Sequence, residues 1–228
     1  LLHLLTDTTP AGQMLYGNPD LKPETSRNFE IGARYNAGSF LIDASAFYTE
    51  AKDYITTVSC SAPGVTCPSH GTLPVRTIHV NANKAQTYGL ELTAEYTIPG
   101  TQFTPYVTGA WMRRNLEFET WSTYHSDTPA LSGRFGLRWE GEIASHDVWT
   151  DLYVRAATAS TQEDSAGVID RLPGYGTLNF AFGGTFGEED KFRYGVAFNN
   201  ILDKEYRSSF SEIPGVGRSV EVSLRMKF

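Results

Sequence analysis

Strict alternation of apolar and polar residues is the feature that most constrains the fold of this chain. In residues 28–35 every second side chain is apolar, and a similar alternation recurs in eight further segments, 40–48, 88–98, 103–114, 131–139, 148–155, 178–182, 192–198 and 220–228. Successive side chains of a strand point to opposite faces, so a period of two indicates strands with one apolar and one polar face. Helical periodicity hardly appears. The sequence therefore predicts an all-β chain of about nine strands.

The connections between these segments alternate in length. Four are brief and rich in turn-forming residues, namely 36–38, 99–101, 141–146 and 187–190. Five are long, polar and rich in Gly, Ser and Pro, namely 1–22, 59–75, 119–128, 161–173 and 208–217. Short turns at one rim and long loops at the other are typical of antiparallel transmembrane β-barrels.

A soluble β-sandwich is the alternative for an alternating all-β chain. Its strands are usually about six residues long, whereas a barrel strand needs about ten to cross a bilayer, and several segments here approach or exceed that length. The polar rows also carry many charges, which suit a water-filled interior better than a sandwich core. They are Asp43, Glu91, Glu95, Arg134, Arg138, Asp151, Arg155 and Arg193.

Composition is consistent with this interpretation. The chain has no apolar run of about 20 residues, which excludes a membrane-spanning helix. The mean hydropathy of −0.30 does not exclude a barrel, because apolar and polar residues alternate along each barrel strand and their mean stays polar. The net charge of −7 argues against nucleic acid as a partner, since phosphate contacts need clustered Lys and Arg.

The two cysteines, Cys60 and Cys67, lie in a stretch rich in Gly, Pro and Ser. Two close cysteines in an otherwise cysteine-free chain favour a disulfide that closes a loop in an oxidising compartment. A zinc site with His70 is the alternative, but a fourth ligand is missing.

Three segments resemble TonB-dependent outer-membrane receptors. Residues 17–25 read GNPDLKPET, residues 81–92 read NANKAQTYGLEL, and residues 196–207 read VAFNNILDKEYR. The chain then ends on an alternating strand closed by Phe228, which looks like the C-terminal signal by which outer-membrane barrels are recognised for assembly. The resemblance spans nearly the whole chain, because the segments occur in the family's order and spacing.

This resemblance implies a barrel of 22 strands around an N-terminal plug. Residues 1–228 are then expected to be the C-terminal part of the barrel domain, without the plug and the earlier strands. The family takes up scarce ligands, mostly ferric siderophores, using energy from TonB, and its partners include outer-membrane lipid and the remainder of the same barrel. We therefore expect uptake of an iron chelate at the outer membrane of a Gram-negative bacterium, with no cofactor. Haem or another metal chelate is the alternative ligand, and an autotransporter translocator or a porin is the alternative barrel.

Ligand contacts are expected from Arg and aromatic residues in or just below the long loops, because these side chains bind anionic or planar groups. The candidates are Tyr16, Arg113, Arg114, Trp121, Tyr124, His125 and Arg171, with Tyr175, Arg207 and Phe210 at neighbouring junctions. Haem receptors of this family carry a His in the loop ahead of the segment that resembles GNPDLKPE, and His3 lies ahead of it here. The upstream family motif that would align His3 with that His is missing. The chain has no Gly-x-Ser-x-Gly, phosphate-loop or His-Glu-x-x-His motif, so we do not expect an enzyme.

Overall fold

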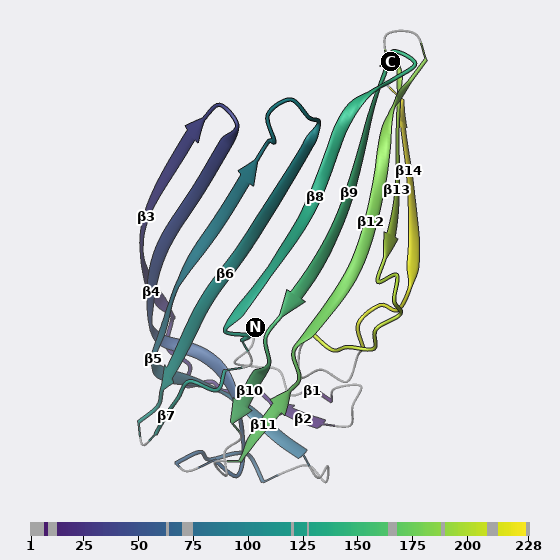
Figure 1. Ribbon diagram of the computed structural model, residues 1–228. Coiled ribbons are helices and arrows are strands. Elements are labelled where there is room, and N and C mark those ends of the chain that lie inside the picture. The colour runs from purple at the N-terminus through teal and green to yellow at the C-terminus, as the bar shows by residue number, and fades with distance from the viewer. Residues whose placement is uncertain are drawn as a thin grey trace.

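The computed structural model describes residues 7–8, 13–62, 64–69, 75–119, 121–126, 128–163, 168–187, 190–208 and 214–226. Nine long strands form one continuous sheet in sequence order, each antiparallel to the next (Figure 1). They are β3 (Thr25–Ala37), β4 (Phe40–Ser59), β5 (Val75–Tyr96), β6 (Phe103–Glu117), β8 (Leu131–Ile143), β9 (His146–Ala157), β12 (Tyr175–Phe186), β13 (Phe192–Asn199) and β14 (Ser219–Met226). The predicted all-β fold and its nine strands are confirmed.

Five short strands add to this sheet or stand beside it. They are β1 (Asp7–Thr8), β2 (Gln13–Tyr16), β7 (Ser122–Thr123), β10 (Ser160–Glu163) and β11 (Ile169–Leu172). Strand β2 runs parallel to β5, an exception to the antiparallel arrangement expected from the sequence. Strands β10 and β11 pair as a separate hairpin, so the segment 161–173 expected to be an irregular loop is partly regular.

The strands β4 and β5 are longer than predicted. Alternation placed their ordered parts at 40–48 and 88–98, but β4 continues to Ser59 and β5 already begins at Val75. The extensions were missed because they carry polar residues such as Thr, Asn and Lys on both faces, which removes the alternating signal. They project past the rest of the sheet at the end where the long loops lie (Figure 1).

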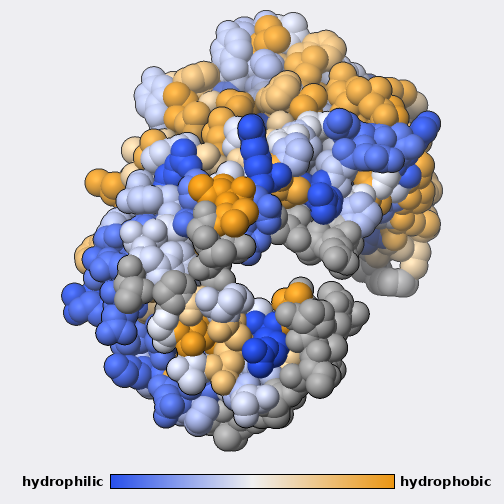
Figure 2. Space-filling model, turned by 90° about the horizontal axis from the view of Figure 1, so that it is seen from below, coloured by the Kyte–Doolittle hydropathy of each residue, from blue (hydrophilic) through white to orange (hydrophobic). Residues whose placement is uncertain are grey.

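The opposite end of the sheet is closed by tight turns. Ala144 and Ser145 both have positive φ, 51° and 62°, and join β8 to β9 as a two-residue hairpin of the kind that matches strand twist. Gly38 and Gly100 provide positive φ at two further turns. Seen from the end that carries the long loops, the molecule curves around an open hollow (Figure 2).

The two faces of the sheet differ as the alternation predicts. The apolar face carries large exposed side chains on most of the long strands, for example Ile31 with 76% and Val222 with 71% of its surface exposed. The polar face holds ion pairs, including Arg34 with Asp43 and Arg138 with Glu95 at 3.8 Å. Apolar side chains that remain exposed over a whole face mark a surface built for contact with lipid or another apolar partner. Among the described residues, no helix is long and apolar enough to cross a membrane.

Candidate functional site

A small apolar core lies at the loop end of the sheet, where β2 runs beside the extensions of β4 and β5. This loop core consists of Tyr16, Val58, Ala62 and Ile78. Tyr16 is fully buried, because β2 lies along the extension of β5 and brings the ring against Val58 and Ile78. Tyr16 was predicted to contact ligand, but its burial gives it a packing role in this structure.

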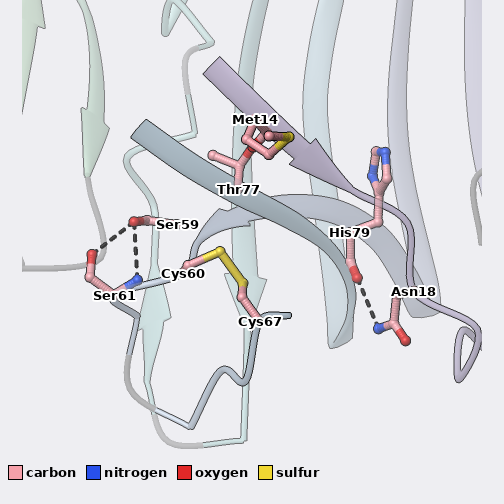
Figure 3. Close-up of a disulfide and its surroundings, with 8 residues drawn as sticks. All are labelled: Met14, Asn18, Ser59, Cys60, Ser61, Cys67, Thr77 and His79. Carbon is pink, nitrogen blue, oxygen red and sulfur yellow. Dashed lines mark hydrogen bonds between the residues drawn. A yellow bond between two sulfur atoms is a disulfide. The ribbon is translucent and has the colours of Figure 1, made fainter. Parts of the chain in front are cut away.

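The disulfide borders the loop core. Cys60 and Cys67 are joined with an S–S distance of 2.03 Å, and both pack against the core as partly buried residues (Figure 3). His70, the third ligand of the alternative zinc site, lies outside the described residues. Within the part of the chain that the structure describes, no group of three or more His, Cys, Asp or Glu side chains has the arrangement of a metal site.

The family motif GNPDLKPE is clamped to the motif that begins at Asn81. The Asn81 amide donates to the carbonyls of Lys22 at 3.0 Å and Asp53 at 2.5 Å, and its oxygen accepts from the Lys22 N–H at 2.8 Å. Asn18 donates in turn to the carbonyl of His79 at 2.9 Å (Figure 3). One Asn side chain therefore joins three segments, so these two motifs hold the loops together.

The third motif, VAFNNILDKEYR at residues 196–207, shapes the loop between β13 and β14. Asn200 is buried and adopts a positive φ of 49°. Its amide donates to the carbonyls of Lys204 at 2.9 Å and Val216 at 3.2 Å, while its oxygen accepts from the Lys204 N–H at 2.9 Å. The side chain thus replaces the backbone partners that a loop lacks.

Asp203 fastens the far side of the same loop. Its carboxylate accepts from the Arg218 backbone N–H at 2.8 Å and lies 3.6 Å from the Arg218 guanidinium. This backbone hydrogen bond and the nearby charge lower the pKa of Asp203 below its ordinary value. The Tyr206 ring stacks on Tyr175 with centroids 4.4 Å apart, so the loop is held against the start of β12.

An arginine cavity of about 560 Å³ opens on the polar face beside this loop. We define it by Arg134 of β8, Arg155 and Tyr153 of β9, Tyr175 of β12 and Arg207 of the β13–β14 loop. No carboxylate is among the described side chains that line it. Arg155 and Arg207 form no ion pair with any described residue, so the cavity carries net positive charge.

Arg134 is held rigidly at the wall of the arginine cavity. Its guanidinium forms an ion pair with the buried Asp151 and lies 3.5 Å from the centroid of the Tyr153 ring. Asp151 also accepts a hydrogen bond of 3.0 Å from the Tyr106 hydroxyl. The Nε atom of Arg134 is buried without a hydrogen-bond partner in the described structure. This cluster preorganises a cationic, aromatic surface suited to an anionic ligand with flat groups.

A second cavity, of about 410 Å³, lies between the β4 extension and the loops after β6 and β9. Three predicted residues, Arg114, Trp121 and His125, line this loop cavity. Trp121 stacks on Phe118 with centroids 4.2 Å apart, and His125 Nδ1 lies 2.7 Å from Thr161 Oγ1. The structure therefore brings these three candidates together, Arg114 from β6 and Trp121 and His125 from the segment that follows it.

Three further candidates, Arg113, Tyr124 and Arg171, lie apart from both cavities. Arg113 and Tyr124 are exposed, and neither lines the arginine cavity or the loop cavity. Arg171 is exposed on the β10–β11 hairpin. Phe228, Phe210 and His3 lie outside the described residues. Sequence reasoning placed Arg134 and Arg155 on the polar face but not in a ligand site, because only the strand register brings them beside Arg207.

Comparisons with known proteins agree with this architecture. Residues 5–201 match the family model described as TonB dependent receptor-like, beta-barrel. The chain is 43% identical over 88 residues to the iron-regulated outer membrane virulence protein of Vibrio cholerae serotype O1, which is 38% of this chain and 14% of that protein. It is 26% identical to the heme/hemopexin utilization protein C of Haemophilus influenzae over 92% of this chain and 30% of that protein.

A solved structure shows the same fold. The FrpB iron transporter from Neisseria meningitidis superposes with a TM-score of 0.69 and 20% sequence identity, covering 92% of this chain and 32% of that chain. The chain spans less than a third of the length of each of these three relatives. Since the family model matches most of its residues, the chain belongs to the TonB-dependent receptor family and forms part of the β-barrel of an outer-membrane protein.

Proposed function

We propose that this chain is the C-terminal part of a receptor barrel that takes up a ferric siderophore in a TonB-dependent manner. The remaining strands and the plug, through which TonB acts in this family, belong on this proposal to the rest of the same receptor. The role is transport rather than catalysis.

The arginine cavity is the observation that carries this proposal. Siderophores combine anionic iron-binding groups with flat aromatic or amide groups, and Arg side chains beside Tyr rings recognise both. Arg155 and Arg207 have no described ion-pair partner, so their charge is available to a ligand. The similarity to a relative named as iron-regulated supports iron as the cargo.

Haem uptake is the second candidate. It is supported by the similarity to the heme/hemopexin utilization protein over most of the chain. His125 in the loop cavity is the residue for axial coordination, since its Nδ1 already faces Thr161 and leaves Nε2 for iron.

Equilibrium binding by the intact receptor separates the two candidates. We expect binding of a ferric siderophore, tested with ferric catecholates and hydroxamates, and a loss of about tenfold or more in Arg155→Gln, because a hydrogen bond to a charged group contributes about 1.5–3 kcal/mol. Arg193→Gln, on the polar face at the other rim, is the matched control and should bind like wild type. Binding of haem but of no siderophore contradicts the proposed ligand. Passive swelling of liposomes in small sugars would point instead to a porin.

A further inference from the structure

The hairpin of β10 and β11 continues the pairing of β9 with β12 across a break. Ser160 pairs with Leu172 in the same antiparallel register in which Ala157 pairs with Tyr175. The two residue pairs between them form no ladder, so β10 and β11 stand as a separate two-stranded sheet beyond the end of β9 (Figure 1). We call β10 and β11 together the arm.

Proline, backbone crowding and a diverted threonine account for the break. Pro173 has no N–H to donate to a ladder. A Cβ at Gly174 would lie 2.6 Å from the carbonyl oxygen of Ala157, so the two backbones approach too closely for a side chain. Thr158 bonds to β8 instead, because its N–H donates to the Leu131 carbonyl at 2.8 Å and its hydroxyl accepts from the Leu131 N–H at 3.0 Å. The arm is therefore joined to the main sheet by a connection outside the ladder.

The base of the arm forms part of the wall of the arginine cavity. Ser160 and Leu172 each expose only 5% of their surface, and they line this cavity together with Pro173. Arg155 and Arg207, the two cations without a described ion-pair partner, line the same cavity. Because the arm is joined to the sheet through the break, a change in its tilt moves Ser160 and Leu172 and reshapes the cavity around the two arginines.

The outer end of the arm is fastened to the segment that follows β6. Gln162 forms an antiparallel bridge with Ser126, and the Glu163 N–H donates to the His125 carbonyl at 3.2 Å. These backbone contacts join β10 to a segment that precedes β8, so they fix the tilt that the break leaves free.

Side chains of the same two segments add further hydrogen bonds. The buried Thr123 hydroxyl donates to the Glu163 carboxylate and accepts from the His125 N–H at 3.0 Å. Thr161 Oγ1 lies 2.7 Å from His125 Nδ1. We call these backbone and side-chain contacts the latch. Because Thr123, His125 and Glu163 also line the loop cavity, the arm contributes to the walls of both cavities.

We propose that Thr161 and Glu163 are positioning residues for the arginine cavity, which they influence through the arm. Neither side chain lines that cavity. While the latch is closed, the arm holds Ser160 and Leu172 in the cavity wall. Release of the latch lets the arm tilt at the break and lowers the affinity for ligand. Because coupling between two sites is reciprocal, ligand bound in the arginine cavity stabilises the latch. The inference rests on the proposed uptake of a ferric siderophore through this cavity.

A covalent replacement of the latch tests this role in the intact receptor. Thr161→Val/Glu163→Ala removes the side-chain contacts and should bind the ferric catecholate or hydroxamate bound by wild type about tenfold more weakly. Affinity falls because fewer molecules have a latched arm. Ser126→Cys/Gln162→Cys, added to that variant, joins two bridge partners whose Cα atoms lie about 4.5–5.5 Å apart, within the range of a disulfide. The oxidised form should regain wild-type affinity and lose it again on reduction.

Two controls isolate the effect of the latch. Wild type measured with and without reductant accounts for reduction of the Cys60–Cys67 disulfide. Glu142→Cys/Asp147→Cys, added to Thr161→Val/Glu163→Ala, joins register partners at the opposite end of the sheet. Its disulfide should restore no affinity.

Rescue by the disulfide separates positioning from direct contact, since a disulfide cannot replace a side chain that touches the ligand. Weaker binding that oxidation does not restore, or wild-type affinity in Thr161→Val/Glu163→Ala, overturns the proposal. If wild type binds neither a ferric catecholate nor a ferric hydroxamate, the proposed function fails instead, and hydrogen exchange decides the role of the latch. Amides of residues 157–160 and 172–175 should exchange about tenfold faster without the latch and return to wild-type rates with the disulfide. Unchanged exchange overturns the inference.

Discussion

Replacement of Asn200 by Ala offers a direct test of how the β13–β14 loop is held. The substitution removes two hydrogen bonds of 2.9 Å to Lys204 and one of 3.2 Å to Val216. It also places Ala at a positive φ of 49°, which Asn tolerates better. At about 1 kcal/mol for each hydrogen bond and about 1 kcal/mol for the backbone, the loop loses about 4 kcal/mol.

Hydrogen–deuterium exchange of residues 200–218 in the intact receptor measures this loss. If the free energy of opening the loop falls by about 4 kcal/mol, amides that exchange through this opening should exchange about a thousandfold faster. Asn200→Gly removes the same hydrogen bonds, but glycine adopts a positive φ without strain. The loop of Asn200→Gly should therefore exchange about fivefold more slowly than that of Asn200→Ala. Because the loop carries Arg207, both variants should also weaken ligand binding at the arginine cavity.

Two outcomes would refute this reasoning. Wild-type exchange in Asn200→Ala would mean that the side-chain hydrogen bonds do not hold the loop. Identical exchange rates in the Ala and Gly variants would mean that the positive φ at residue 200 does not strain an alanine there. Exchange in the β8–β9 hairpin serves as the internal control and should stay the same in all three proteins.

Three further predictions concern other parts of the structure. Reduction of the Cys60–Cys67 disulfide should destabilise its loop by about 2 kcal/mol, measured as faster limited proteolysis, with no effect expected in a Cys-to-Ser double variant treated in the same way. The pKa of Asp203 is lower in the folded protein than in the unfolded one, so its carboxylate stabilises the loop fully above the unfolded-state pKa. This stabilisation is lost as the pH falls through the folded-state pKa. Hydrogen exchange of the loop, corrected for intrinsic rates, should therefore rise on acidification in wild type but not in Asp203→Asn. Gly89→Ala should lower the free energy of unfolding by about 1–3 kcal/mol in denaturant titrations, because the added methyl meets the Phe47 ring at 2.8 Å and the Trp111 carbonyl; wild-type stability would contradict the close packing.

The loop motifs show how far sequence similarity reaches. The segments around Asn18, Asn81 and Asn200 identified the family, but their composition did not reveal that the Asn side chains hold backbone groups of distant segments. Such contacts depend on how loops fold back on one another, and no periodic pattern records them. Tyr16 illustrates the same limit, since an aromatic residue in a polar loop can face ligand or fill a core.

What the sequence determined by itself was the nine long strands, their two faces and the positions of the tight turns. These follow from local physics, because side-chain direction alternates with each residue and turn residues act over two to four positions. The tertiary structure decided which residues meet. Arg134, Arg155 and Arg207 converge on one cavity, while Arg113 and Arg114, adjacent in sequence, face opposite sides of the sheet. Convergence depends on inter-strand register and loop packing, which are long-range interactions between segments far apart in the chain.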